Sequence, residues 1–158
     1  MKISKYLTYE EVVKSNTALR KSIRNVPNRN QLNNIVLWAK NIFDPVRVFV
    51  GAPLGCNSIF RSVKLNRTIG GSSTSQHCAN NGAAGDIDCK VYNHLTNKEI
   101  FNYIKDNLDF DQLISEFETN REPNWVHVSY VSKEKNRNQV LISYKNKNNK
   151  TKYKYYDQ

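Results

Sequence analysis

The sequence predicts an α+β fold in which helices pack on a mostly antiparallel sheet. Capping signals and apolar residues at helical spacing dominate the chain up to Gly51, and short segments of alternating polarity close it. The 158 residues, 39% of them apolar, suit one domain with a single buried core. We therefore expect one domain over residues 1–145 and a basic, low-complexity tail over residues 146–158, either frayed or added as a late strand.

Two helices are predicted before the first predicted strand. Thr8 and Glu11 form a capping box that opens a short helix. Asn28 caps a longer helix, which kinks or restarts at Pro45 and ends at Gly51. Its apolar positions recur at helical spacing and are Leu32, Ile35, Val36, Ala39, Ile42 and Phe43.

Shorter elements follow these helices. Residues 55–60 predict a short strand, and residues 62–71 predict a turn of helix stopped by paired glycines. The stretch DIDCKVY, residues 86–92, alternates in polarity like a half-buried strand. Thr96 and Glu99 form a second capping box, which opens another helix.

Three strands are predicted at the end of the chain, over residues 110–118, 125–131 and 139–144. The period of two along the first strand groups four side chains on one face: Gln112, Ile114, Glu116 and Glu118. Along the second strand it groups Trp125, His127, Ser129 and Val131. We expect these two strands to pair across the loop that joins them.

The chain is strongly basic, with a net charge of +10 and a pI near 9.6. Such a charge indicates a polyanionic partner or surface: nucleic acid, membrane headgroups or an acidic cell wall. No stretch is apolar for long enough to span a membrane. The N-terminal segment has no apolar region with a cleavage site, so we expect synthesis in the cytoplasm without a signal peptide.

The loop GSSTSQHCANNGAAGDIDC, residues 71–89, combines small residues with residue types that bind zinc. His77 is one candidate ligand, and either Asp86 or Asp88 is a second. His127 offers a third from the middle of a strand, although a histidine there can also be a satisfied core residue. Two histidines and one carboxylate leave a fourth position to water, which is typical of a catalytic zinc site.

The sequence around these ligands resembles a known family. The segments IFRSVKLNRTIGGSSTSQH and NWVHVSY are similar to D-alanyl-D-alanine carboxypeptidase-type zinc metallopeptidases. These enzymes share the hedgehog and lysostaphin-like zinc fold and include phage endolysins. The likeness begins in the N-terminal helix and covers nearly the whole chain. Its motifs are Arg-Ser, Gly-Gly-Ser, Ser-x-His, an Asp after small residues, and Trp-x-His-x-Ser.

The resemblance implies a zinc-dependent peptidase that cleaves peptidoglycan stem peptides during cell-wall lysis or remodelling. Its activity would be that of a D-Ala-D-Ala carboxypeptidase or an L-Ala-D-Glu endopeptidase. The implied zinc ligands are His77, Asp86 and His127. The implied substrate-binding residues are Arg61, Ser75 and Gln76. Asp86 is preferred over Asp88 although its spacing from the histidine is longer than usual, and the charge of Arg61 also suits a developing oxyanion.

The catalytic base needs a separate argument. Many relatives hold a carboxylate three residues before the last histidine, but that position is Asn124, which cannot accept a proton. Glu116, Glu118 and Glu122 are the other candidates to carry the proton from water to the leaving amine. We choose Glu116 because its strand should pair with the His127 strand. The alternative is an exposed glutamate without a catalytic role.

Two other classes of function remain open. A zinc-stabilised, inactive wall-binding module would share the ligands but lack the base. A basic nucleic-acid-binding protein would explain the charge, but the aromatic residues do not alternate with Lys and Arg outside the tail. We expect zinc as the cofactor, peptidoglycan stem peptides rather than nucleic acid as the partner, and a monomer that reaches the cell wall after release or delivery.

Overall fold

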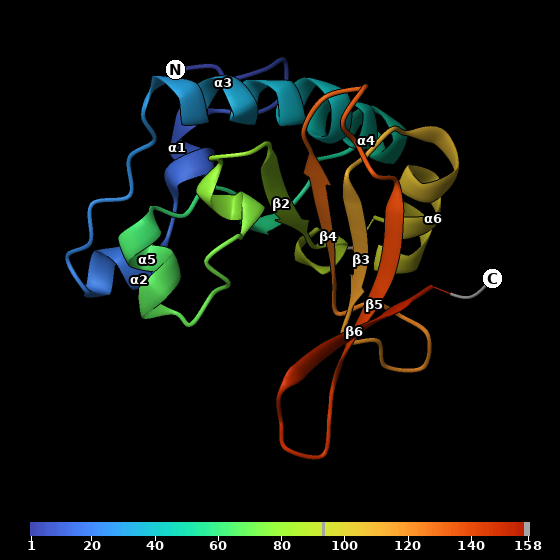
Figure 1. Cartoon of the computed structure of the whole chain (residues 1–158). Coiled ribbons are helices and arrows are strands. Elements are labelled where there is room, and N and C mark those ends of the chain that lie inside the picture. The colour runs from blue at the N-terminus through green and yellow to red at the C-terminus, as the bar shows by residue number, and fades with distance from the viewer. Residues whose placement is uncertain (93, 157–158) are drawn as a thin grey trace.

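The computed structural model describes residues 1–92 and 94–156 and has an α+β architecture (Figure 1). Its sheet has the strand order β1-β2-β4-β3-β5-β6. β3 and β5 run parallel, and the other neighbouring strands run antiparallel. The strands are β1 (Cys56–Ser58), β2 (Ala83–Ile87), β3 (Gln112–Glu116), β4 (Trp125–Tyr130), β5 (Gln139–Lys145) and β6 (Thr151–Tyr155). The predicted fold class is confirmed.

The helices begin where their capping residues predict. The α-helices are α1 (Tyr9–Val13), α2 (Asn16–Arg20), α3 (Arg29–Trp38), α4 (Asp44–Val50), α5 (Val63–Thr68) and α6 (Asn97–Asn107). Capping boxes open α1, α3 and α6 at Thr8, Asn28 and Thr96. A π-helical turn, η1 (Ala39–Phe43), joins α3 to α4, which has Pro45 in its first turn and ends at Gly51. The predicted restart and end are therefore confirmed, whereas α2 was not predicted.

The sheet has one face packed on helices and one face with polar side chains. α3, α4 and α6 cover the first face (Figure 1), where their apolar side chains form a core with those of β2, β3 and β4. The period of two turns the alternate residues of these strands to the other face. Those residues border a groove, and they include Asp86, Gln112, Glu116 and His127.

The strand predicted over residues 86–92 is wrong in its limits. β2 lies earlier, and a short 3₁₀ helix, η3 (Cys89–Val91), follows it. The side chain of Asp88 accepts a hydrogen bond from the Lys90 backbone and caps η3. A capping aspartate ends the strand because its side chain satisfies backbone groups that a strand would pair.

The strand predicted over residues 110–118 ends early, at Glu116. Phe117 has a φ of +48°, which breaks the alternation of side chains. Glu118 therefore leaves the face of Glu116, and its carboxylate accepts a hydrogen bond from Ser115, which lies on the helix-covered face.

β5 and β6 form a hairpin that projects beyond the rest of the sheet (Figure 1). Residues 151–155 of the expected tail thus form a strand, and residues 157–158 lie outside the described residues. The hairpin has five exposed lysines: Lys145, Lys147, Lys150, Lys152 and Lys154. None of the described helices has the length and apolar character to cross a membrane.

Candidate metal centre

His77, Asp86 and His127 come together at the groove face of the sheet. His77 Nε2 lies 3.2 Å from both Asp86 Oδ1 and His127 Nδ1, and His127 Nδ1 lies 3.0 Å from Asp86 Oδ1. Ligand atoms of a tetrahedral zinc ion, with bonds of about 2.0–2.1 Å, lie about 3.3 Å apart. The three atoms therefore form a triangle of the size that zinc requires.

Backbone hydrogen bonds hold both the ring and the main chain of His77 in place. His77 lies in the 3₁₀ helix η2 (Gln76–Cys78), and its Nδ1 lies 2.8 Å from the carbonyl oxygen of Ile59. Nδ1 therefore carries the proton, and the lone pair of Nε2 faces the cluster. The Arg61 backbone also donates to the His77 carbonyl at 2.9 Å. Burial lowers the pKa of His77, which favours the neutral form that binds metals.

Asp86 and His127 are direct partners across β2 and β4. Burial by itself raises the pKa of Asp86, but the neighbouring His77 and His127 outweigh burial and hold the pKa of Asp86 well below its ordinary value. The carboxylate is therefore ionised, as a metal ligand must be.

Helix α3 supports this strand pair from behind. A Cβ at Gly85 would come within 2.3 Å of the Trp38 ring, so only glycine lets the ring lie this close to β2. Trp38 Nε1 also donates to the Val128 carbonyl of β4 at 3.0 Å. The ligand strands thus rest on a rigid aromatic side chain.

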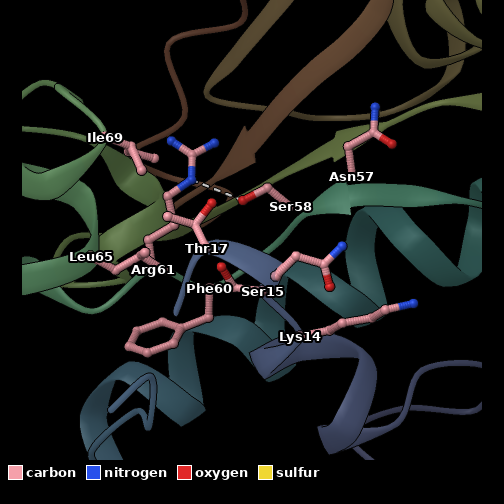
Figure 2. A pocket seen from close by; sticks show the side chains of 10 residues that line it. Lys14, Ser15, Thr17, Asn57, Ser58, Phe60, Arg61, Leu65 and Ile69 are labelled. Atoms are coloured by element: carbon pink, nitrogen blue, oxygen red, sulfur yellow. Dashed lines mark hydrogen bonds between the residues drawn. The ribbon is translucent and has the colours of Figure 1, made fainter. Parts of the chain in front are cut away.

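Arg61 lies between two hollows of the surface. It borders both the groove and a smaller pocket of about 270 Å³ formed by the α1–α2 connection, β1 and α5 (Figure 2). Its Nη2 donates to Asp86 Oδ2 at 2.9 Å, and its Nε donates to Ser58 Oγ at 2.8 Å. Arg61 therefore orients a candidate ligand, and direct contact with substrate stays a prediction.

The groove that contains the cluster has a volume of about 1380 Å³. Residues 69–76 form one wall, and Leu141, Lys145, Thr151 and Tyr153 of the β5–β6 hairpin form another. Ser75 and Gln76 lie in the first wall. Ser75 Oγ accepts from the His77 backbone at 3.4 Å, and Gln76 Nε2 donates to Asp111 at 2.9 Å. Both side chains support the wall, and their contact with substrate stays a prediction.

Glu116 borders the groove, whereas the other two candidate bases bond elsewhere. Glu118 accepts from Ser115, and Glu122 accepts from the Asn97 backbone at the start of α6, at 2.8 Å. Glu116 is only 8% exposed. Burial raises the pKa of Glu116, against the opposing effects of the Ser143 hydroxyl and His127.

Asp88, the alternative ligand, lies outside the cluster. Its carboxylate accepts hydrogen bonds from Asn57 at 3.2 Å and from Asn97 at 3.1 Å. Asn124 also has a structural role, because its Nδ2 donates to the Phe117 carbonyl at 2.8 Å. The Ser143 contact with Glu116 was not predicted. It depends on the parallel pairing of β3 with β5, which no local sequence pattern predicts.

The chain matches a known protein family over most of its length. The family model described as Peptidase M15 matches residues 5–129. The match includes all three members of the cluster and ends within β4, before β5 and β6. No curated protein matches the chain.

Proposed function

Because this chain belongs to the Peptidase M15 family, we propose that it hydrolyses peptidoglycan stem peptides with a zinc ion held by His77, Asp86 and His127. M15 peptidases are in general zinc-dependent metallopeptidases. The observation that carries the proposal is the triangle of two histidine nitrogens and one carboxylate oxygen, which opens onto a groove. Three protein ligands leave one position for water or substrate.

The chemistry that zinc supplies in such a site is Lewis acidity toward the scissile carbonyl and a water molecule. Glu116 would accept the proton of the attacking water and return it to the nitrogen of the leaving amine. Its buried position suits this role, because burial moves the pKa of a carboxyl group toward neutrality. Arg61 would keep Asp86 ionised and hold its carboxylate in the orientation that binds the metal. The same guanidinium would face carbonyl oxygens of a bound peptide.

Basic side chains along the groove suit a peptide substrate that carries carboxylates. Lys135, Arg137 and Lys145 border it in addition to Arg61. Substrate could be a D-Ala-D-Ala terminus or an L-Ala-D-Glu bond, and both provide carboxylates that these cations would attract. We further propose that the enzyme acts on the cell wall after release or delivery, in lysis or remodelling.

Metal analysis combined with peptidoglycan digestion tests this proposal. The parent protein should contain about one zinc ion per chain, and His77→Ala, Asp86→Ala and His127→Ala should lose both zinc and cleavage. Asp88→Ala is the matched control, because it removes a nearby carboxylate outside the cluster and should retain zinc. Mass spectrometry of the digested peptides identifies the bond that is cut.

Three results would contradict the proposal. Full zinc content in His77→Ala would overturn the ligand assignment. Stoichiometric zinc without cleavage of any muropeptide would favour an inactive wall-binding module, and salt-sensitive DNA binding without wall activity would favour a nucleic-acid-binding protein.

A further inference from the structure

Ser143 contacts Glu116 from a strand that lies outside the family match. β5 runs parallel to β3 and places Ser143 directly opposite Glu116. Ser143 Oγ donates a hydrogen bond to Glu116 Oε2, and the two residues are only 1% and 8% exposed. Since the match ends at residue 129, this contact comes from a part of the chain that the family pattern does not describe.

The bend after β3 sets the direction of the Ser143 hydroxyl. Phe117 N donates to Ser143 Oγ at 3.1 Å. A serine hydroxyl has a single proton, so with one lone pair engaged by Phe117 its proton is directed to Glu116.

Asn124 holds this bend in place. The Phe117 backbone has a positive φ, a conformation that costs energy for an aromatic residue. The Asn124 backbone donates to the Glu116 carbonyl at 2.9 Å, and its side chain donates to the Phe117 carbonyl. Asn124 therefore stabilises the turn that aims Ser143 at Glu116.

The two oxygens of Glu116 have different surroundings. Oε2 is held by Ser143, whereas no described residue donates a hydrogen bond to Oε1. Because Glu116 borders the groove, Oε1 is the atom available to a water molecule there.

We infer that Ser143 is a positioning residue, which holds Glu116 so that Oε1 accepts the proton during peptide hydrolysis; this rests on the proposed function. The proton moves from the attacking water to Oε1 and then to the nitrogen of the leaving amine. The Ser143 proton stays on Oγ throughout. The charged and titratable groups around Glu116 are His127, Asp86, Arg61 and Tyr153.

Ser143→Ala should lower kcat about tenfold or more and leave KM within about twofold, because Ser143 acts through the base rather than on the substrate. The acid limb of the kcat/KM profile should move to higher pH, since a hydrogen bond that favours the ionised carboxylate is lost. Zinc content should be unchanged. Ser143→Thr, which retains a hydroxyl, should recover most of the activity.

Ser115→Ala is the matched control. Ser115 is also buried on β3, and its hydroxyl donates to Glu118 on the opposite face of the sheet. This variant should keep kcat and the pH profile of the parent. Should Ser143→Ala fail to fold, Ser143→Cys replaces it, because a thiol fills the same space with a much weaker donor.

A double-mutant cycle separates positioning from a general structural role. In the Glu116→Gln background, Ser143→Ala should cause no further loss of kcat. An equal loss in that background, or normal kcat in Ser143→Ala, would overturn the inference while leaving an active parent and the proposed function intact. A parent that cleaves no stem peptide would overturn the proposed function and the role of Ser143 together.

Discussion

Glu116 is a buried carboxylate whose surroundings fit the proposed proton transfer. Its strand position turns it to the groove, and burial raises its pKa. Asn124 donates a hydrogen bond to the backbone of Phe117, the residue that follows Glu116. Among the three candidate bases, Glu116 is the one that borders the groove.

The first prediction concerns this carboxylate. Glu116→Gln should retain the fold and zinc, because the shape is conserved and no proposed ligand is lost. Its kcat should fall by about 100-fold or more, the usual scale for a positioned proton-transfer group. Steady-state kinetics on purified muropeptides measures the loss. Glu118→Gln, on the other face, should stay within about twofold of the parent, and a large loss there with normal Glu116→Gln would reverse the assignment.

At the scale of elements, Asp111 connects three separate segments beside the groove. Its carboxylate accepts from Gln76 of η2 at 2.9 Å. It also accepts from Arg137 Nε at 2.8 Å and Nη2 at 2.6 Å, in the connection between β4 and β5. Burial on its own raises the pKa of Asp111, but these hydrogen bonds outweigh burial and lower the pKa below its ordinary value. The ionised carboxylate thus links η2, the start of β3 and the β4–β5 connection.

This arrangement predicts a pH-dependent stability. Because the folded-state pKa of Asp111 is lowered, its contribution is present above the unfolded pKa of about 3.9 and is lost as the pH falls through the folded pKa. At pH 7, Asp111→Asn should reduce the free energy of unfolding by about 1–3 kcal/mol. The difference from the parent should shrink toward about pH 3.

Urea unfolding at several pH values measures this effect. Asp109→Asn is the control, because Asp109 is exposed and should leave the free energy of unfolding nearly unchanged. A constant difference between Asp111→Asn and the parent across the whole pH range would show that the ionised carboxylate does not cause the stabilisation.

Over the whole molecule, the positive charge is concentrated in one projecting element. Residues 139–155 contain five lysines and no acidic residue, and the net charge of the chain is +10. Since the hairpin also forms a wall of the groove, we expect it to hold an anionic wall polymer next to the proposed active site. Lysines on the edge strand β6 would also hinder pairing between sheets of two molecules.

Replacing four lysines of the hairpin by glutamine should therefore weaken binding to insoluble cell-wall material at about 50 mM salt. Near 1 M salt, where exposed charges are screened, the variant and the parent should bind equally. The positions are Lys147, Lys150, Lys152 and Lys154. Cleavage of small soluble muropeptides should stay within about twofold, because these lysines do not border the groove. Sedimentation with purified cell walls measures the bound fraction.

A second set of exposed lysines provides the control: Lys2, Lys21, Lys40 and Lys133. Their replacement changes the net charge equally but leaves the hairpin intact. Equal losses in both sets would mean that net charge alone holds the protein to the wall. Unchanged binding together with aggregation of the hairpin variant would mean that its lysines protect the edge strand.

The sequence by itself determined the features that depend on neighbouring residues. Capping boxes, the proline restart and the glycine stop predicted α1, α3, α4 and α6, because these signals act within a few residues. The period of two placed Glu116 and His127 on the faces of their strands that border the groove. The candidate ligands followed from residue types and from the family resemblance.

Only the tertiary structure decided how distant segments meet. Asp86 lies beside His127 because β2 pairs with β4, whereas Asp88 is bonded to Asn57 and Asn97 outside the cluster. Glu118 lies on the opposite face from Glu116 because Phe117 has a positive φ. Ser143 contacts Glu116 because β3 pairs in parallel with β5, whose residues lie more than twenty positions away in the sequence. Such contacts form because burying the sheet on α3 and α6 stabilises one register over all others, and that balance involves the whole core rather than any local pattern.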